Sequence, residues 1–253
     1  MFPLGDDIPM LRRPVMVTAL LVLLAGAWIL LQGAGADSMT LASSVCNWGM
    51  VPAELTHRLK VGTAVHLGPE LLCVVDEELI NPFTPLTSMF LHGSWGHLLG
   101  NGIFLWVFGK AVEDSMGRLR FLAFYLLCGL AAAAVHVAVE PASPLPTVGA
   151  SGAISGMLGA YLVLYPRARV RLLFILVFLI RVISLPAYVV LLWWVAYQVL
   201  AGLPQLLSEE PAVSAGVAFW AHVGGFAAGV LGIKLFEDKH RVEHRLALRR
   251  GYF

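Results

Sequence analysis

The sequence predicts an all-α polytopic membrane protein with six transmembrane helices. Of its 253 residues, 58% are hydrophobic and only 13% are charged, whereas a soluble domain carries about 25% charged residues. Six apolar windows of about 20 residues follow one another along the chain, and a helix of this length crosses a bilayer. The lysines and arginines cluster between alternate windows. The sequence contains no basic patch with interleaved aromatic residues, so it does not predict nucleic-acid binding.

The six apolar windows define the expected spans and a single membrane domain over residues 14–236. The spans are 14–32, 87–109, 119–139, 149–165, 184–203 and 216–236. The first window is too long for a signal peptide, and no small-residue cleavage motif follows it. The segment 172–180 is apolar as well, but it is too short to cross and is flanked by Arg171 and Arg181. We therefore expect it to lie at the membrane interface.

The positive charges predict the orientation in the membrane. Six spans place both chain ends on one side, and all the lysines and arginines except Arg58 and Lys60 fall on that side. Because positively charged connections stay in the cytoplasm, the N-terminal segment 1–13 and the basic tail 237–253 are expected there, the tail as a solvated segment. The loops expected to face outward are 33–86, 140–148 and 204–215. No transit peptide is recognisable, which favours a bacterial inner (plasma) membrane.

Polar side chains able to do chemistry lie inside three of the apolar windows. His97 and Asn101 are four residues apart and share a helix face, Ser151 opens the fourth window and His222 lies in the sixth. Counted at ~1.5 Å per residue from the basic residue near the cytoplasmic end, Ser151, His97 and His222 lie ~24, ~20 and ~18 Å deep. They are therefore expected in one layer of the ~30 Å hydrocarbon core. Polar groups there are costly and are usually kept for function, and a serine and a histidine at matching depth would be a nucleophile and its base.

Small residues accompany both Ser151 and His222. Gly225 and Gly229 follow His222 by three and seven positions, so they share its helix face. The window that begins near Ser151 is rich in glycine and alanine, and small side chains let two membrane helices approach closely. A tight contact between the fourth and sixth spans would bring Ser151 against His222.

Three motifs occur in this order on the expected spans. They are Asn81-Pro-Phe-Thr-Pro-Leu-Thr-Ser-Met-Phe-Leu-His92-Gly-Ser-Trp-Gly-His97-Leu-Leu-Gly-Asn101, then Gly149-Ala-Ser151-Gly152, and then Ala221-His222-Val-Gly-Gly225-Phe-Ala-Ala-Gly229. Together they resemble the rhomboid intramembrane serine proteases, and the resemblance covers roughly residues 14–236. The simple form of that family also has six spans and both ends in the cytoplasm.

The resemblance implies a rhomboid-like bundle with a Ser–His dyad and no acidic third member. Ser151 would be the nucleophile, and His222 would be the general base and then the general acid. The expected oxyanion donors are His97, Asn101 and the backbone N–H of Ser151. The residues that would support the site are His92, Gly149, Gly152, Gly225 and Gly229. The resemblance implies no cofactor and no metal.

The implied activity is that of an intramembrane serine endopeptidase. It would hydrolyse peptide bonds in or beside single-pass transmembrane segments, so its partners would be single-pass membrane proteins within the lipid bilayer. The active site would open toward the periplasmic or extracellular side. Because the peptide bonds of a helix are hydrogen-bonded and shielded, a substrate helix must unwind before attack.

Three positions depart from the family pattern. Trp48 is followed by Gly49 where the family has a Trp-Arg pair in the first outer loop, and Gly102 is small where a larger residue is common. Ser155 stands one turn after the nucleophile, where some members carry an aromatic side chain that stacks on the dyad histidine. Other packing is therefore expected to orient His222.

Two other functions remain open from the sequence. A catalytically silent rhomboid-like protein would bind membrane helices, although it would typically lack Ser151 or His222. A small transporter that uses membrane histidines would more often show inverted repeats or carboxylates in its spans. A zinc site built from His92, His97 and His222 would lack both the His-Glu-x-x-His pair and a carboxylate ligand in the spans.

The cysteines leave one question open. Cys46 and Cys73 both lie in the expected outer loop 33–86, while Cys128 lies in the third span. In an oxidising periplasm the first two could form a disulfide, but two cysteines in a long loop do not by themselves predict the pairing.

Overall fold

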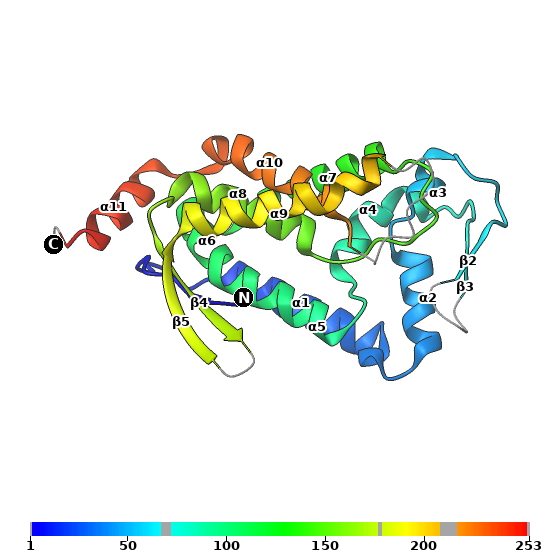
Figure 1. Ribbon diagram of the computed structural model, residues 1–253, viewed down its shortest axis with the longest axis horizontal. Coiled ribbons are helices and arrows are strands. Elements are labelled where there is room, and N and C mark those ends of the chain that lie inside the picture. Colours follow the sequence, from blue (N-terminus) through cyan, green and yellow to red (C-terminus); the bar gives the residue numbers. More distant parts are fainter. Residues whose placement is uncertain (1, 67–71, 177–178, 208–216, 252–253) are drawn as a thin grey trace.

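The computed structural model describes residues 2–66, 72–176, 179–207 and 217–251, and this part of the chain is mostly helical. The long helices lie roughly along the long axis of the molecule (Figure 1). The helices are α1 (Val15–Leu30), α2 (Ser38–Trp48), α3 (Pro52–Thr56), α4 (Thr84–Thr87), α5 (Trp95–Phe104), α6 (Lys110–Met116), α7 (Arg118–Val139), α8 (Ser151–Leu164), α9 (Ala187–Leu207), α10 (Phe219–Phe236) and α11 (Lys239–Arg249). Three 3₁₀ turns are η1 (Gly33–Gly35), η2 (Asn81–Phe83) and η3 (Ser88–Phe90), and the π-helical turn η4 (Leu105–Gly109) joins α5 to α6.

Each expected span contains a helix, but their lengths differ. Within the described residues, α7, α10 and Ala187–Leu206 of α9 are long and apolar enough to cross a membrane, whereas α1 and α8 are shorter apolar helices. The expected span 87–109 is wrong at its start, because α5 begins at Trp95. Ser94 caps this helix by accepting a hydrogen bond from the N–H of His97 (3.1 Å), so the helix cannot extend back to residue 87. Most of the expected loop 204–215 lies outside the described residues.

Helix α8 is the buried centre of the bundle. Every residue from Ala153 to Tyr161 is buried, and α7 and α10 pack against α8 and against each other. A helix that is apolar on all sides is buried either in a protein core or in lipid, and α8 is buried by the other helices. Helix α8 has 14 residues and is only about 21 Å long. It can be this short because other helices surround it.

The expectation of an all-α fold is wrong for the region around residues 172–180. Strands β4 (Arg169–Leu176) and β5 (Leu179–Pro186) form an antiparallel hairpin, and β1 (Phe2–Gly5) pairs with β4 to give the order β1-β4-β5. The two strands together contain two valines and three isoleucines, and β-branched residues favour strands. Because a short apolar run has no decisive period, its hydropathy did not reveal the hairpin. Helix α9 consequently starts at Ala187 and not at residue 184.

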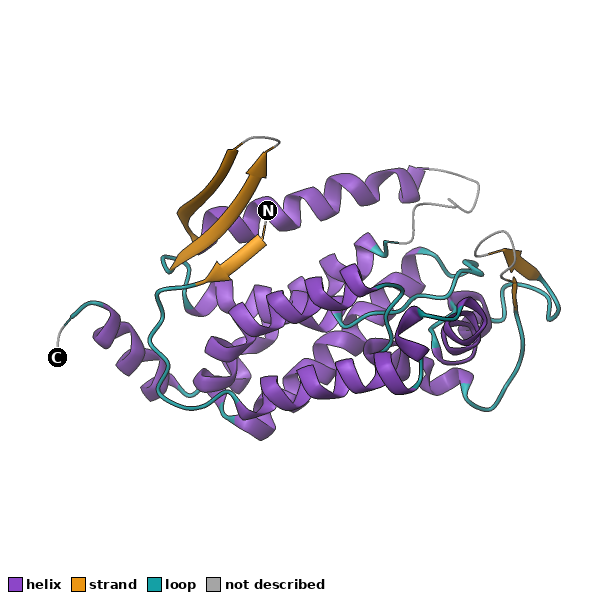
Figure 2. Ribbon diagram, turned by 90° about the horizontal axis from the view of Figure 1, so that it is seen from below, coloured by secondary structure: helices purple, strands orange, loops and turns teal. Residues whose placement is uncertain are grey.

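The basic tail packs against the bundle and is not simply a solvated segment. Arg245 of α11 is fully buried. Its Nη1 donates to the carbonyl oxygen of Ala111 (2.6 Å) and to the hydroxyl of Tyr165 (2.9 Å), and its Nε donates to the carbonyl oxygen of Pro9 (3.0 Å). Arg249 pairs with Asp7 at 2.8 Å. The N-terminal strand, the hairpin and α11 therefore lie together at one end of the molecule, as the two views in Figures 1 and 2 show.

The expected outer loop 33–86 folds at the opposite end (Figure 2). It contains α2, α3 and a second small sheet of β2 (Ala64–His66) and β3 (Leu72–Val74). A disulfide between Cys46 and Cys73 joins α2 to β3, which answers the question that the sequence left open.

On α3, Glu54 is a buried carboxyl, with 7% of the residue exposed. Burial, followed by the nearby Asp76 carboxylate, raises the pKa of Glu54 from its ordinary value of 4.5 to about 7.

We expect Glu54 to make the stability of this protein depend on pH. Because folding raises the pKa of Glu54, its contribution is fully present below pH 4.5 and is lost as the pH rises through about 7. The wild type should therefore melt at a lower temperature at pH 8 than at pH 5, and Glu54→Gln, which cannot ionise, should lose most of this difference. Thermal unfolding in detergent measures it, with Glu77→Gln, an exposed glutamate of the same loop, as the control. A Glu54→Gln variant with the wild-type pH dependence would contradict this account.

Candidate active site

Ser151 is the first residue of α8, where the chain turns into the helix. Gly149 has a φ of +127°, a conformation that glycine adopts without strain, and its N–H donates to the carbonyl oxygen of Ser88 (2.9 Å). Ala150 precedes the helix and has no side chain able to accept a hydrogen bond from the first turn. The N–H groups of that turn and the positive end of the helix dipole are therefore next to Ser151, where they would stabilise a negative charge.

Glycines let α8 and α10 touch through their backbones. A Cβ atom added to Gly225 would lie 2.0 Å from the carbonyl oxygen of Gly152, and one added to Gly229 would lie 2.0 Å from that of Gly156. Real Cβ atoms essentially never approach so closely. The small residues therefore set the separation of the two helices, and this separation brings His222 within reach of the start of α8.

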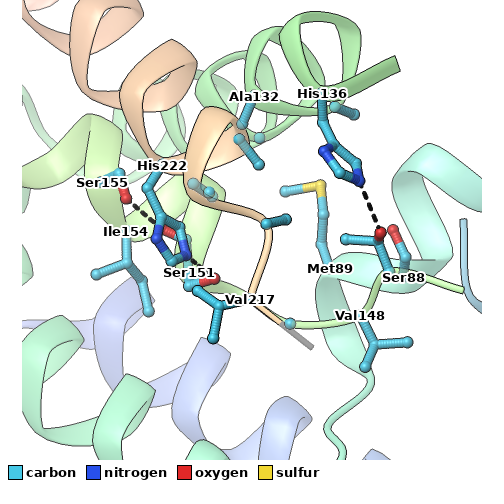
Figure 3. A pocket seen from close by; sticks show the side chains of 18 of the residues that line it. Ser88, Met89, Ala132, His136, Val148, Ser151, Ile154, Ser155, Val217 and His222 are labelled. Carbon is cyan, nitrogen blue, oxygen red and sulfur yellow. Dashed lines mark hydrogen bonds between the residues drawn. The ribbon is translucent and has the colours of Figure 1, made fainter. Parts of the chain in front are cut away.

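Ser151 and His222 are in direct hydrogen-bond contact. Nε2 of His222 lies 2.8 Å from Oγ of Ser151, and Nδ1 lies 2.9 Å from Oε1 of Gln198 on α9. The ring of Trp194 packs on the imidazole at 5.8 Å between centroids. Figure 3 shows the imidazole pointing toward Ser151 inside the pocket. As expected from the serine at position 155, packing from elsewhere orients His222, and it comes from α9.

His97 and Asn101 lie beside the backbone that leads into Ser151. A Cβ atom added to Gly149 would be 2.6 Å from Nε2 of His97 and 3.6 Å from Nδ2 of Asn101. These two side chains line a cavity of about 630 Å³ together with Ser151 and His222. Side chains from α5, α8 and α10 thus converge on one cavity, in the combination that the sequence predicts.

His92 lies in the connection before α5 and supports Asn101. It is fully buried, and its Nε2 is 2.9 Å from Nδ2 of Asn101. The side chain of Gln32 holds the backbone of His92 at both ends, accepting from its N–H (2.8 Å) and donating to its carbonyl oxygen (2.7 Å). The rings of His92 and His97 contact edge to face, 5.1 Å apart. His92 therefore positions the two other polar side chains and lies behind them.

The part of the chain that the structure describes contains no group of three or more His, Cys, Asp or Glu side chains able to hold a metal ion. The polar groups that line the cavity are hydroxyl, imidazole and amide groups from α5, α7, α8, α9 and α10 and from the connecting loops, together with the carboxyl group of Glu140.

Comparison with known proteins identifies the family of this chain. Residues 81–237 match the Rhomboid domain. The chain belongs to the rhomboid family. It is 46% identical over 77 residues to rhomboid protease GluP of Bacillus subtilis, covering 30% of this chain and 15% of the relative. It is 38% identical over 77 residues to putative rhomboid protease YdcA of the same organism, covering 30% and 38%, and 40% identical over 72 residues to chloroplastic Rhomboid-like protein 11 of Arabidopsis thaliana, covering 28% and 25%. The matched segments thus span well under half of each relative.

Two buried glutamines of this rhomboid were missed by the sequence analysis. Gln198 is a polar residue within an apolar span, one helical turn after Trp194, and such a residue is a signal for a contact between membrane helices. Gln32 is the last residue of the expected first span and lies two residues beyond the end of α1, and a polar residue at the end of a span carries no comparable signal. His136, another polar group in the same pocket, lies 3.0 Å from Oγ1 of Thr147 on the side away from the dyad (Figure 3).

We expect Gly225→Ala to separate α8 from α10. The added methyl group must displace the carbonyl of Gly152, and overpacking of this kind costs about 1–3 kcal/mol, more than the roughly 1 kcal/mol that alanine gains over glycine in a helix. Thermal unfolding of the purified rhomboid in detergent should give a lower midpoint for this variant. Gly26→Ala on α1 is the matched control, because nothing lies within 4 Å of its added methyl group. Equal midpoints for the two variants would refute the close-contact argument.

Proposed function

We propose that this rhomboid is an intramembrane serine endopeptidase that cleaves single-pass membrane proteins in or beside their transmembrane segments. The observation that carries the proposal is the 2.8 Å contact between Nε2 of His222 and Oγ of Ser151, which lies in a cavity also lined by His97 and Asn101. A hydroxyl that donates to an unprotonated imidazole nitrogen is the starting state for nucleophilic attack.

The reaction follows from these contacts in two halves. Oγ of Ser151 attacks the peptide carbonyl carbon while Nε2 of His222 takes the hydroxyl proton. The tetrahedral intermediate then collapses, the C–N bond breaks, and His222 gives the proton to the leaving amine. In the second half, His222 takes a proton from water, the hydroxide attacks the acyl-enzyme ester, and the proton returns to Ser151 as the carboxylic acid product leaves.

The negative charge of each tetrahedral intermediate would be stabilised by three donors. These are the N–H of Ser151, the side chain of His97 and the amide of Asn101. The Asn101 amide carries two N–H donors, so a contact with His92 leaves the second one for the substrate. Fixed donors of this kind act strongly in a site of low dielectric constant.

The six-span topology belongs to the same proposal. Both termini would lie in the cytoplasm of a bacterial inner membrane, beside the basic hairpin and α11, and the cavity would open toward the outer loops. Residues of these loops, including Met50, Pro85 and Thr147, line the cavity. Substrates would enter as single transmembrane helices and would unwind locally before cleavage.

Ser151→Ala and His222→Ala are each expected to abolish cleavage. Because the two side chains act as one unit, either loss should lower the rate about 10³-fold or more. The assay uses the purified full chain in liposomes with a single-pass test substrate, and separates the fragments by electrophoresis. Ser43→Ala, an exposed serine on α2, is the control and should cleave normally. Cleavage that persists in both active-site variants would refute the assignment, and a folded wild type without any cleavage would favour a silent rhomboid-like protein that binds membrane helices.

Asn101→Ala is expected to lower kcat about 10- to 10³-fold with a much smaller change in KM, since the lost hydrogen bond forms mainly in the transition state. Steady-state kinetics on the same substrate measure both constants, and Asn47→Ala on the exposed face of α2 serves as the control. A change in KM alone would show that Asn101 binds substrate without stabilising the oxyanion.

A further inference from the structure

We propose that Gln198 is a positioning residue that selects the reactive tautomer of His222; this inference rests on the proposed function. The carbonyl oxygen Oε1 of Gln198 lies 2.9 Å from Nδ1 of His222, on the opposite side of the ring from Ser151. Both ring nitrogens are therefore engaged, one by α9 and the other by α8.

The chemistry of the two contacts determines which nitrogen carries the proton. A neutral imidazole has one N–H donor and one acceptor nitrogen. The amide carbonyl oxygen of Gln198 only accepts hydrogen bonds, so Nδ1 must carry the proton. Nε2 is then the acceptor, which is the form of His222 able to take the proton of Ser151. With the amide reversed, its NH₂ group would favour the other tautomer, and His222 could not act as a base.

The burial of Gln198 strengthens its hydrogen bond with His222. The residue is only 6% exposed, and hydrogen bonds are stronger where the local dielectric constant is low. Trp194, one turn earlier on α9, packs against the face of the same imidazole at 5.8 Å and against Phe226 at 6.2 Å. Helix α9 thus fixes His222 in two ways, with an indole on its face and an amide at its edge.

An amide suits this position better than a carboxylate would. A charged group inside a membrane span is costly, whereas the neutral amide orients the imidazole without adding a charge. Among the described residues, the other titratable groups close enough to influence His222 are His97 on α5 and His136 on α7, and neither occupies the Nδ1 edge that Gln198 holds.

Two substitutions test the proposal in the full chain. Gln198→Leu removes the acceptor at similar volume, and we expect kcat to fall about 10- to 10³-fold while KM changes little, because part of the imidazole adopts the wrong tautomer. Gln198→Glu keeps an acceptor and adds charge when ionised, so it should retain more activity than Gln198→Leu and move the acid limb of the kcat–pH profile. Leu200→Ala, an exposed position on α9, is the control for substitution in this helix.

The tautomer can be observed directly. Nitrogen NMR of ¹⁵N-histidine-labelled protein, with His222 assigned by comparison with His222→Ala, should find Nδ1 protonated in the wild type and a mixture in Gln198→Leu. Wild-type kcat and an unchanged tautomer in Gln198→Leu would overturn the proposal, and so would equal losses in both variants with an unmoved pH profile. If the wild type cleaves only when Ser151 and His222 are intact, these outcomes refute the role of Gln198 alone. If Ser151→Ala cleaves as well as the wild type, the proposed function itself fails.

Discussion

The backbone contact between α8 and α10 is the constraint on which the rest of the site depends. The carbonyl groups of Gly152 and Gly156 lie so close to Gly225 and Gly229 that a side chain at either of the latter two positions would have to displace one of them. Membrane helices gain no hydrophobic free energy by leaving lipid for protein, so close van der Waals contact between small residues is a main source of their association. The same contact puts an imidazole on one helix within 2.8 Å of a hydroxyl on the other. The glycines that let α8 and α10 pack closely therefore also set the distance between Ser151 and His222.

Hydrogen bonds between elements far apart in the sequence hold the remaining polar groups. Gln32 binds the backbone of His92, and His92 contacts Asn101. On the other side of the cavity, Gln198 binds His222. An unpaired polar group in an apolar interior costs more free energy than a paired one returns. Each of these contacts consequently favours one arrangement of the helices and orients the polar groups that line the cavity.

Hydropathy predicts the approximate position of every long apolar helix, because the bilayer demands a long run of apolar residues. Motif and spacing likewise predict the four polar residues that converge on the cavity. The β4–β5 hairpin was missed because residues 172–180 are apolar whether they form a helix or a strand. Arg245 was expected to be solvated because its partners Pro9, Ala111 and Tyr165 come from distant segments. Local composition does not reveal such contacts.

The role of Gln198 is only partly predictable from the sequence. A glutamine inside an apolar span is visible in the sequence and indicates a hydrogen bond, but its partner is decided by how α9 rotates against α10. In the part of the chain that the structure describes, the side chains that contact His222 from α9 are the amide of Gln198 and the indole of Trp194, and neither carries a charge. Soluble serine proteases have a buried carboxylate behind the catalytic histidine. Within the hydrocarbon layer of a membrane, the desolvation free energy of the same charge would be larger. A neutral amide behind the histidine would supply orientation without that cost, and in the proposed reaction charge would develop only on the imidazole and the oxyanion.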